Sequence, residues 1–524
     1  MQKTTLPFST AGFSGLVTDY LFNNPNLKDF YQYIPELASF KEAITAKQKQ
    51  SIDRETLVNV LKDQYSELNT DYPLLNTLLQ KNTFTVTTGH QLNLFSGPLY
   101  FIYKIVTTIK LAEELKKTYP EYNFVPLYWM ASEDHDIAEI NHTNIFGKKI
   151  SWNTAQKGPA GRLSTQDMIP VLEELKTILG ESEQALSLYS LISKAYTDNK
   201  SLAAATRALV HKLFGQYGLV IIDADDARLK KLFIPIITED IIHQHSFKTV
   251  SEQAKKLEAY HKVQVHPREI NFFYMEDGLR ERIVEEAGKY KVLNTTLSFS
   301  KEELQQELNL HPEKFSPNVV TRPLYQESIL PNIAYIGGPA EVAYWFEYKT
   351  MFEHYKVPYP VVMLRNCMLW LDENISSKIE KLKLNSEDLF EDTDHLVNKY
   401  IRQHSGSDIS VTAEIETLNT LFDALQQKAT NIDPTLKASV DGEKQKVMAA
   451  LQGIEGKIVK AQKKKEETTV NQIKSIKEKL FPNGSLQERT DNFSQYYIKY
   501  GTNFIETLLQ QADPFSKEFV VIHA

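Results

Sequence analysis

Short apolar, β-branched runs alternate with amphipathic stretches over the first 360 residues of the chain. Runs of this length, some apolar at nearly every position, are typical of strands buried on both faces of a parallel sheet. Five of them lie at residues 84–88, 124–130, 218–223, 333–336 and 360–364. Because helical stretches separate them, the pattern predicts an α/β fold with a doubly wound, mostly parallel sheet. The alternative is a set of unrelated α+β pieces.

Two further patterns add detail to this core. Pro98 stands where the first residue of a helix is expected, and Leu99, Ile102, Val106 and Ile109 then form one apolar face. Two short runs within residues 271–284 are joined by an Asp-Gly pair, which predicts a β-hairpin with its turn at that pair. We therefore expect residues 1–370 to form the core, with an α+β module inserted at about 225–315.

The pattern changes to helix alone after residue 370. Apolar or small residues recur at spacings of three and four from Val411 to Ile432 and again from Val447 to Leu480. Spacing of this kind over several repeats predicts a coiled coil. Asp433 and Pro434 are a typical cap and first helical residue, so we expect a second helix over 434–480 that runs antiparallel to the first. The predicted helical domain covers residues 371–480, and residues 481–524 are expected to return to the core.

Composition and charge exclude several classes of protein. The chain has 524 residues and a formal net charge of −8, whereas nucleic-acid-binding proteins usually carry a basic excess. A single Cys excludes a disulfide framework and a thiolate metal cluster. No apolar run approaches the roughly 18 residues of a membrane span, and the opening residues lack the pattern of a signal peptide. We therefore expect a cytoplasmic protein without a nucleic-acid or membrane partner.

Polar side chains follow the first predicted strand, where ligands bind in an open parallel sheet. His90, Gln91, Asn93 and Ser96 lie between this strand and the helix at Pro98. Glycines nearby allow a close approach of the backbone, and the positive end of the helix points toward the loop. These four residues are candidates for binding an anion, a nucleotide or another substrate.

Four consecutive ionisable residues, Glu133 to Asp136, follow the second strand. His135 between Asp134 and Asp136 is suited to proton transfer, because neighbouring carboxylates raise the pKa of an imidazole and fix its tautomer. The same residues are also suited to binding a divalent metal, or to capping a helix that starts at Ser132. We take Asp134, His135 and Asp136 as the candidate catalytic residues and leave a metal requirement open.

A third group surrounds the fourth strand. Arg322 has the geometry to clamp a carboxylate, and Tyr325 and Gln326 follow it as further substrate-binding candidates. Gly337 and Gly338 lead into a helix whose N–H groups are expected to approach a carboxylate or phosphate, and the carboxylate of Glu341 in its first turn is suited to an amine. Cys367, among apolar neighbours, is expected to be a core residue and not a nucleophile.

Four blocks of the sequence, in this order, resemble the bacillithiol biosynthesis cysteine-adding enzyme family. They are TTGHQLNLFSGPLYFIYK, YWMASEDHDIAEINH, SPNVVTRPLYQESILPNIAYIGGPAEVAYW and the late FPNGSLQERTDNFSQYY. The chain length and a coiled coil before the last block are also similar, so the resemblance covers the whole chain.

The resemblance implies a putative cysteine ligase that adds L-cysteine to the amine of glucosaminyl-malate through an amide bond. It also implies a Rossmann-like core with inserted connecting modules, a coiled coil that forms a homodimer, and binding of ATP or another nucleotide. Asn483, Gln487 and Arg489 of the last block are then candidate nucleotide-binding residues. The chain lacks the H-x-G-H and K-M-S-K-S sequences of class I synthetases, so an adenylate intermediate is not implied.

Amide formation requires an activated carboxyl group and a deprotonated amine. We expect the cluster around His135 to take the proton, Arg322 to hold a malate carboxylate, and the turn at Gly337 to receive a second carboxylate or a phosphate. Two alternatives are a nucleotidyl-transfer enzyme acting on another small acid, and a non-catalytic coiled-coil scaffold.

Overall fold

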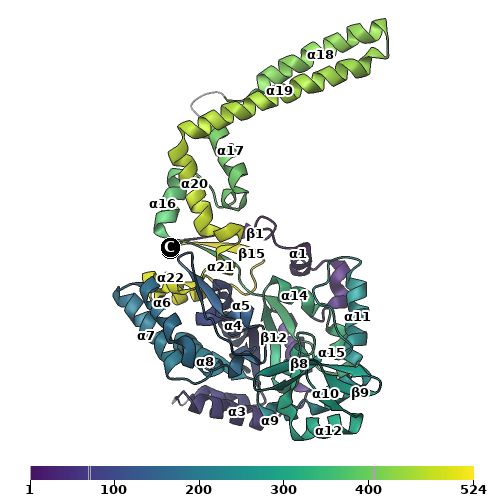
Figure 1. The fold of residues 1–524 in the computed structure, drawn as a ribbon, viewed down its shortest axis with the longest axis vertical. Coiled ribbons are helices and arrows are strands. Elements are labelled where there is room, and N and C mark those ends of the chain that lie inside the picture. Colours follow the sequence, from purple (N-terminus) through teal and green to yellow (C-terminus); the bar gives the residue numbers. More distant parts are fainter. Residues whose placement is uncertain (1, 69, 71, 405–408) are drawn as a thin grey trace. The chain divides into compact units, whose positions relative to one another are not determined.

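The chain divides into two compact units (Figure 1). The computed structural model describes residues 2–68, 70, 72–404 and 409–524. The larger unit consists of Thr5–Leu369 and Leu486–Ile522, and the smaller of Met1–Thr4, Trp370–Ser485 and His523–Ala524. Residues 370–485 are therefore an insertion in the chain of the larger unit.

A five-stranded parallel sheet forms the centre of the larger unit. Its strands are β2 (Thr83–His90), β3 (Asn123–Met130), β6 (Val220–Asp223), β12 (Asn332–Gly337) and β13 (Val361–Leu364). Their order is β13-β12-β2-β3-β6, and every neighbouring pair is parallel. All five predicted strands are confirmed, and they belong to one doubly wound sheet and not to unrelated pieces. The order reverses between β2 and β12, where such sheets bind ligands.

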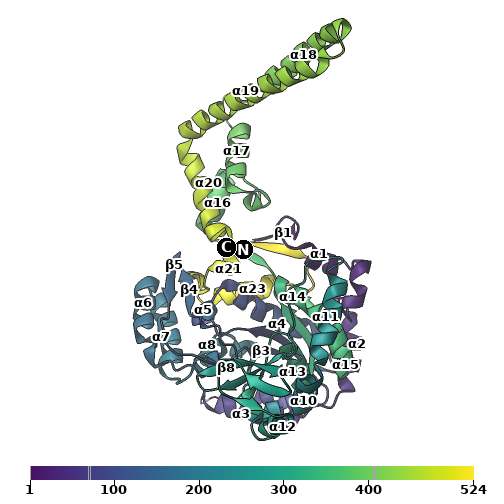
Figure 2. The same cartoon turned by 45° about the vertical axis from the view of Figure 1, so that its right-hand side comes forward.

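Helices pack against this sheet (Figure 2). The helix predicted after Pro98 is α4 (Leu99–Thr118), which packs across β2, β3 and β12, while α8 (Leu202–Phe214) packs on β6 and α2 (Ser39–Gln48) on β12 and β13. One buried cluster joins α2, α4 and three strands, and it includes Phe40, Phe84, Leu111, Ile336 and Met363. Burying these apolar side chains is what fixes the layers.

An α+β module interrupts the chain between β6 and β12. Its helices are α9 (Ala227–Lys231), α10 (Ile234–His243), α11 (His245–Leu257) and α12 (Lys301–Leu310). Its strands are β7 (Phe272–Glu276), β8 (Leu279–Glu286), β9 (Lys289–Val292), β10 (Ser298–Phe299) and β11 (Phe315–Pro317), which form an antiparallel sheet in the order β10-β9-β8-β7-β11. The predicted hairpin is β7–β8, in which Glu276 pairs with Leu279 and Gly278 takes a φ of 77°.

The other elements of this part of the chain are shorter or lie further from the sheet. Before β6 they are β1 (Gln2–Pro7), α1 (Gly15–Leu21), α3 (Arg54–Ser66), α5 (Ile137–Ile140), β4 (His142–Ile145), β5 (Lys148–Ser151), α6 (Ile169–Leu179) and α7 (Glu183–Thr197). After the module they are α13 (Arg322–Ile329), α14 (Pro339–Trp345), α15 (Lys349–Tyr355), β14 (Met368–Leu371), α21 (Gln487–Thr490), α22 (Ser494–Tyr500), α23 (Asn503–Gln511) and β15 (Glu518–His523). In both views α6 and α7 lie on one side of the larger unit and α11 on the other (Figures 1 and 2).

The smaller unit is helical. Its helices are α16 (Glu373–Lys381), α17 (Thr393–His404), α18 (Thr412–Ile432), α19 (Leu436–Lys465) and α20 (Glu467–Leu480). Gln426 bonds to Asp441 at 2.5 Å and Lys444 to Asp423 at 2.9 Å, so α18 and α19 run antiparallel as predicted. Within the described residues no helix has the length and apolar composition needed to cross a bilayer.

The single helix predicted over 434–480 is wrong, because the chain forms two helices that are separated at Glu466. This residue leaves the helical conformation, with φ −103° and ψ 29°. Three lysines precede it in the last turn of α19, where cations complement the helix dipole. The regular spacing of apolar residues is also interrupted here. The first apolar residue that α20 buries is Val470, nine positions beyond Ala461, and Ile473 and Leu480 follow it. This irregular interval was the signal available in the sequence.

Candidate functional site

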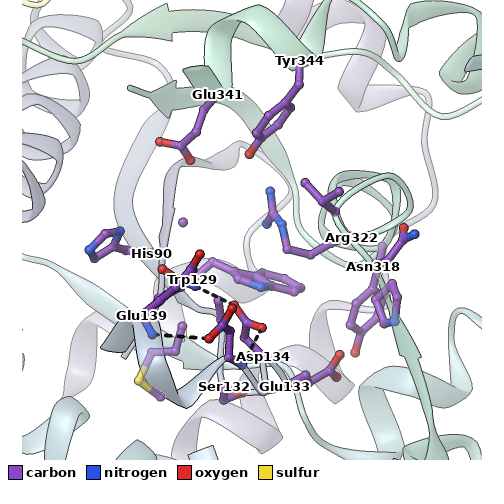
Figure 3. A pocket seen from close by; sticks show the side chains of 18 of the residues that line it. His90, Trp129, Ser132, Glu133, Asp134, Glu139, Asn318, Arg322, Glu341 and Tyr344 are labelled. Atoms are coloured by element: carbon purple, nitrogen blue, oxygen red, sulfur yellow. Dashed lines mark hydrogen bonds between the residues drawn. The ribbon is translucent and has the colours of Figure 1, made fainter. Parts of the chain in front are cut away.

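A cavity of about 1170 Å3 lies in the larger unit at the carboxyl ends of the parallel strands (Figure 3). Gly89 to Gln91 line it at the end of β2, Trp129 to Asp136 at the end of β3, and Gly338 to Glu341 after β12. The inserted module contributes residues of β7 and β8. The cavity is therefore centred on the point where the strand order reverses.

Glu341 forms an ion pair with Lys104 on one wall. The ammonium group of Lys104, buried in α4, also donates to the carbonyl of Gly89 at 2.6 Å. Glu341 further accepts hydrogen bonds from the hydroxyl of Tyr335 at 2.7 Å and from the N–H of Gly338 at 2.8 Å. Burial alone would raise the pKa of Glu341, but Lys104 and these donors hold that pKa below its ordinary value. Glu341 is thus a fixed carboxylate.

The turn at Gly337 and Gly338 does not have the predicted free N–H groups. The N–H of Gly338 is used by Glu341, and the carbonyl of Gly337 accepts from the N–H of Arg365 at 2.9 Å. Gly337 is also absent from the described residues that line the cavity. The turn therefore positions Glu341 at the wall of the cavity, which Gly338 also lines.

Arg322 lines the cavity and lies close to two aromatic rings. Its Nη1 donates to Oε1 of Gln326 at 3.0 Å, and its guanidinium group lies 6.0 Å from the ring of Trp129 and 5.6 Å from that of Tyr335. Its Nη2 is buried and has no hydrogen-bond partner within the described part of the chain. In Figure 3 the guanidinium group points into the open space below Glu341 and Tyr344. An unsatisfied buried donor of this kind is suited to an anionic ligand.

Two predicted substrate ligands near Arg322 have other contacts. Gln326 is fully buried and orients Arg322, and it is not among the described residues that line the cavity. Tyr325 does line the cavity, but its hydroxyl donates to the carbonyl of Ala224 at 2.9 Å. Of this predicted group, only Arg322 presents an uncommitted polar atom in the described part of the chain.

The acidic segment after β3 is a loop and not the start of a helix. The helix expected from Ser132 begins instead at Ile137, and His142 is the first residue of β4. Asp136 is the N-cap of that short helix and accepts from the N–H of Glu139 at 3.4 Å. The capping role is therefore confirmed for Asp136, because a residue at this position satisfies a free N–H of the first turn.

Asp134 and Glu139 are held together by Gln91. The amide nitrogen of Gln91 donates to Oδ2 of Asp134 at 2.7 Å and to Oε2 of Glu139 at 2.8 Å. The other carboxylate oxygen of Asp134 accepts from the N–H of His135 at 2.7 Å. Figure 3 shows the two carboxylates converging at the floor of the cavity, so Gln91 supports an acidic site as a positioning residue.

His135 contacts a guanidinium group more closely than it contacts a carboxylate. Nη1 of Arg280 lies 2.8 Å from its Nδ1, whereas the nearest oxygen of Asp134 lies 3.9 Å from that atom. Burial and Arg280 together lower the pKa of His135. Asp134 and Asp136 raise this pKa as expected, but burial and Arg280 outweigh them, so the net shift is downward. Because a guanidinium only donates, Nδ1 accepts and the imidazole is neutral.

Among the four residues predicted after β2, only His90 and Gln91 line the cavity within the described chain. The ring of His90 stacks on Phe101 at 4.9 Å, and burial, Lys104 and Arg365 hold its pKa well below the ordinary value. Asn93 and Ser96 instead form the buried turn before α4, where Asn93 lies against Gly97.

The three late candidates have different surroundings. Arg489 is exposed and lines the cavity, Gln487 is buried in α21, and Asn483 belongs to the smaller unit. Glu488, which lies between Gln487 and Arg489 in the sequence, forms a bidentate ion pair with Arg365 at 2.6 and 2.8 Å. Both side chains are buried. This pair attaches the last segment of the larger unit to the end of β13.

Sequence reasoning missed the basic side chains that the inserted module brings to the cavity. Arg280 and Arg282 of β8 and Arg268 before β7 all line it. Arg280 also donates to the hydroxyl of Ser316 at 3.0 Å and to the carbonyl of Pro317 at 3.2 Å. The i, i+2 spacing of two arginines was an available signal, because such residues share one face of a strand.

Two other groups, Glu133 at the cavity and Cys367 in the core, have structural roles. Glu133 is paired with the buried Lys230 and accepts from Ser316 at 2.8 Å, and burial raises its pKa. Cys367 is fully buried, and burial raises the pKa of its thiol to about 12. The prediction that Cys367 is a core residue is confirmed.

Comparison with known proteins agrees with this architecture. Residues 1–366 match the family model described as "Bacillithiol biosynthesis BshC, N-terminal Rossmann-like domain", and residues 368–524 match "Bacillithiol biosynthesis BshC, C-terminal coiled-coil domain". A protein of Flavobacterium psychrophilum named "Putative cysteine ligase BshC" is 46% identical over 100% of this chain and 99% of its own. Proteins of the same name from Flavobacterium johnsoniae and Christiangramia forsetii are 45% and 43% identical, and each alignment covers at least 97% of both chains.

Proposed function

Because the chain belongs to the BshC family of bacillithiol biosynthesis, we propose that it is a cysteine ligase that joins the carboxyl group of L-cysteine to the amine of glucosaminyl-malate. The observation that carries this proposal is the division of charge in the cavity. Asp134 and Glu139 meet on its floor, while Arg322, Arg280 and Arg282 supply cations elsewhere on its wall. A substrate with one amine and two carboxylates is complementary to such a cavity.

The acidic side is suited to the amine. Asp134 and Glu139, joined by Gln91, accept the substrate ammonium group, and one of them must take its proton before the nitrogen attacks the activated carbonyl. Nδ1 of His135 is occupied by Arg280, so its neutral ring has no free lone pair. We assign the role of base to Asp134 and a positioning role to His135.

The basic side of the cavity is suited to the malate carboxylates and to the phosphate groups of the nucleotide that activates cysteine. Arg322 offers to a carboxylate a buried Nη2 that has no hydrogen-bond partner among the described residues. ATP or another nucleotide, when bound, supplies the phosphoryl or nucleotidyl group that activates the cysteine carboxyl. The guanidinium groups of Arg282 and Arg489 fit its phosphate oxygens by charge, and a cavity of about 1170 Å3 exceeds the 300–1,000 Å3 typical of one small ligand.

The smaller unit supports a further part of the proposal, a homodimer. The helices α18 and α19 carry exposed apolar side chains along their length, among them Leu421, Leu425, Ile432, Ile454 and Ile458. An amphipathic hairpin with an uncovered apolar stripe is suited to pairing with a second copy.

The proposed reaction is tested by mass spectrometry. Purified protein incubated with glucosaminyl-malate, L-cysteine and ATP is expected to form bacillithiol, and deletion of the gene from a bacillithiol-producing source strain is expected to remove the thiol and accumulate glucosaminyl-malate. Release of pyrophosphate without bacillithiol would favour nucleotidyl transfer to another acid. An unchanged thiol profile, without a second copy of the gene, would contradict the proposal.

The assignment of the base predicts different effects for three neighbouring variants. Asp134→Asn is expected to lower kcat by about 10²-fold or more, since general-base catalysis typically contributes 10²–10⁴-fold. His135→Asn is expected to lower kcat less than about tenfold if the ring only positions its neighbours. Asp136→Asn removes a charge but keeps the helix cap, so it serves as the matched control.

These variants are compared by steady-state rates of bacillithiol formation between pH 6 and 9. A loss of about 10²-fold in His135→Asn, with Asp134→Asn nearly unchanged, would transfer the role of base to the histidine. Far-UV circular dichroism confirms that each variant is folded.

A further inference from the structure

A cluster of metal-ligating side chains lies on the larger unit, away from the cavity. Glu239 of α10, His245 of α11 and His354 of α15 bring one potential ligand atom each to within 4.8 Å of one another. None of the three is among the described residues that line the cavity. Among the described residues this is the only such group of three His, Cys, Asp or Glu side chains, and the loop of Asp134 to Asp136 does not form one.

The separations within the cluster fit a tetrahedral metal ion. Oε1 of Glu239 lies 3.6 Å from Nε2 of His245 and 3.5 Å from Nε2 of His354. Zinc binds imidazole nitrogen and carboxylate oxygen at about 2.0–2.2 Å, which places neighbouring tetrahedral ligands roughly 3.3–3.6 Å apart. Two of the three separations are therefore nearly those that a bound ion would require, and the third is within 4.8 Å.

One buried carboxylate holds all three elements in place. Asp240, next to Glu239, accepts from the N–H and hydroxyl of Ser246 at 2.6 and 2.7 Å and from the hydroxyl of Tyr355 at 2.8 Å. Ser246 follows His245 and Tyr355 follows His354, so the neighbour of each ligand is bonded to the neighbour of Glu239. Networks of this kind preorganise metal ligands.

The two histidine rings lie close together. Their ring centroids lie 4.0 Å apart. Between α10 and α11, Gln244 has a φ of 57°, which turns the chain sharply, and the ring of His243 lies 5.7 Å from that of His245. A set of two imidazoles and one carboxylate is a ligand set that Zn²⁺ favours.

We propose that Glu239, His245 and His354 bind one Zn²⁺ ion at a site separate from the cavity. The ion completes its shell with water or with His243. Because α10 and α11 belong to the inserted module and α15 to the chain after β12, the metal cross-links two parts of the larger unit that are distant in sequence.

The proposal is tested on the full-length, tag-free protein after treatment with a chelator. Titration with zinc chloride against a chromophoric competitor is expected to show one tight site per chain. His245→Gln and Glu239→Gln are each expected to weaken binding at least 100-fold, because second-shell changes alone typically cost 10–100-fold. Glu239 is 47% exposed at its side chain, so its variant is expected to fold normally.

His311→Gln is the matched control, because His311 pairs with Glu313 at 3.3 Å at an exposed position without a second histidine. Its zinc affinity is expected to equal that of the wild type. Replacement of zinc by Co²⁺ gives a second readout, a tetrahedral visible absorption that is lost in His245→Gln and Glu239→Gln. The proposal is overturned if the wild type binds zinc no more tightly than the double variant Glu239→Gln/His245→Gln, or if His311→Gln weakens binding equally.

Discussion

Replacing Arg322 by glutamine is expected to lower kcat/KM for glucosaminyl-malate by about 10²-fold. A charge-assisted hydrogen bond to a carboxylate contributes roughly 1.5–3 kcal/mol, and 1.4 kcal/mol corresponds to a factor of ten. The buried Nη2 of Arg322 has no partner within the described chain, and Gln326 already fixes the orientation of the guanidinium group. The substitution therefore removes a preorganised cation from the cavity.

Two variants serve as controls in the same steady-state assay. Arg322→Lys keeps the charge but not the planar fork, so we expect it to recover only part of the loss. Arg228→Gln removes an arginine that is paired with Asp63 and Asp226 outside the cavity, and we expect its kinetics to match the wild type. If Arg322→Gln had wild-type kcat/KM, Arg322 would not bind the substrate carboxylate.

Replacing Arg365 by methionine is expected to lower the free energy of unfolding by about 3–5 kcal/mol. The Arg365 and Glu488 side chains are 3% and 0% exposed, and removing one partner of a buried ion pair leaves the other charge uncompensated. The effect is expected mainly on stability, since the pair joins two segments of the larger unit.

The ion pair is isolated by a double-mutant cycle measured through urea unfolding. Arg365→Met/Glu488→Met is expected to be more stable than Arg365→Met alone, because both buried charges are then absent. If the double variant were as unstable as the sum of the two single variants, the pair would contribute no coupling and the loss would come from packing.

The sequence allowed the parallel sheet to be predicted because its strands are buried on both faces. Such strands are nearly continuous apolar runs, and all five stand out from their surroundings. The helix break at Glu466 was harder to predict, since one short segment of non-helical backbone leaves only a single irregular interval in the apolar spacing. The loop at Ser132 was mistaken for a helix because acidic residues favour both the first turn of a helix and an irregular binding loop.

The position of the site could be predicted from the sequence, but the contacts between its residues could not. The strand ends indicated where His90, Asp134 and Glu341 gather, because the carboxyl ends of parallel strands share one edge. The partners that decide their chemistry come from far along the chain. Burial, together with Arg280, which contacts His135 across 145 positions, outweighs the carboxylates and lowers the pKa of His135. A single sequence without pairing information does not reveal such contacts.

The insertion of residues 370–485 into the larger unit has a consequence for how the protein is made. Arg365 and Glu488 are 123 positions apart, so at roughly 5–20 residues per second the ribosome needs about 6–25 s to produce the second after the first. During that time all five strands of the parallel sheet have been synthesised, but the guanidinium group of Arg365 does not yet have the carboxylate of Glu488 as its partner. The wall of the cavity also lacks Arg489. A nascent chain of this protein therefore gains a complete cavity only after residues 370–485 have been synthesised.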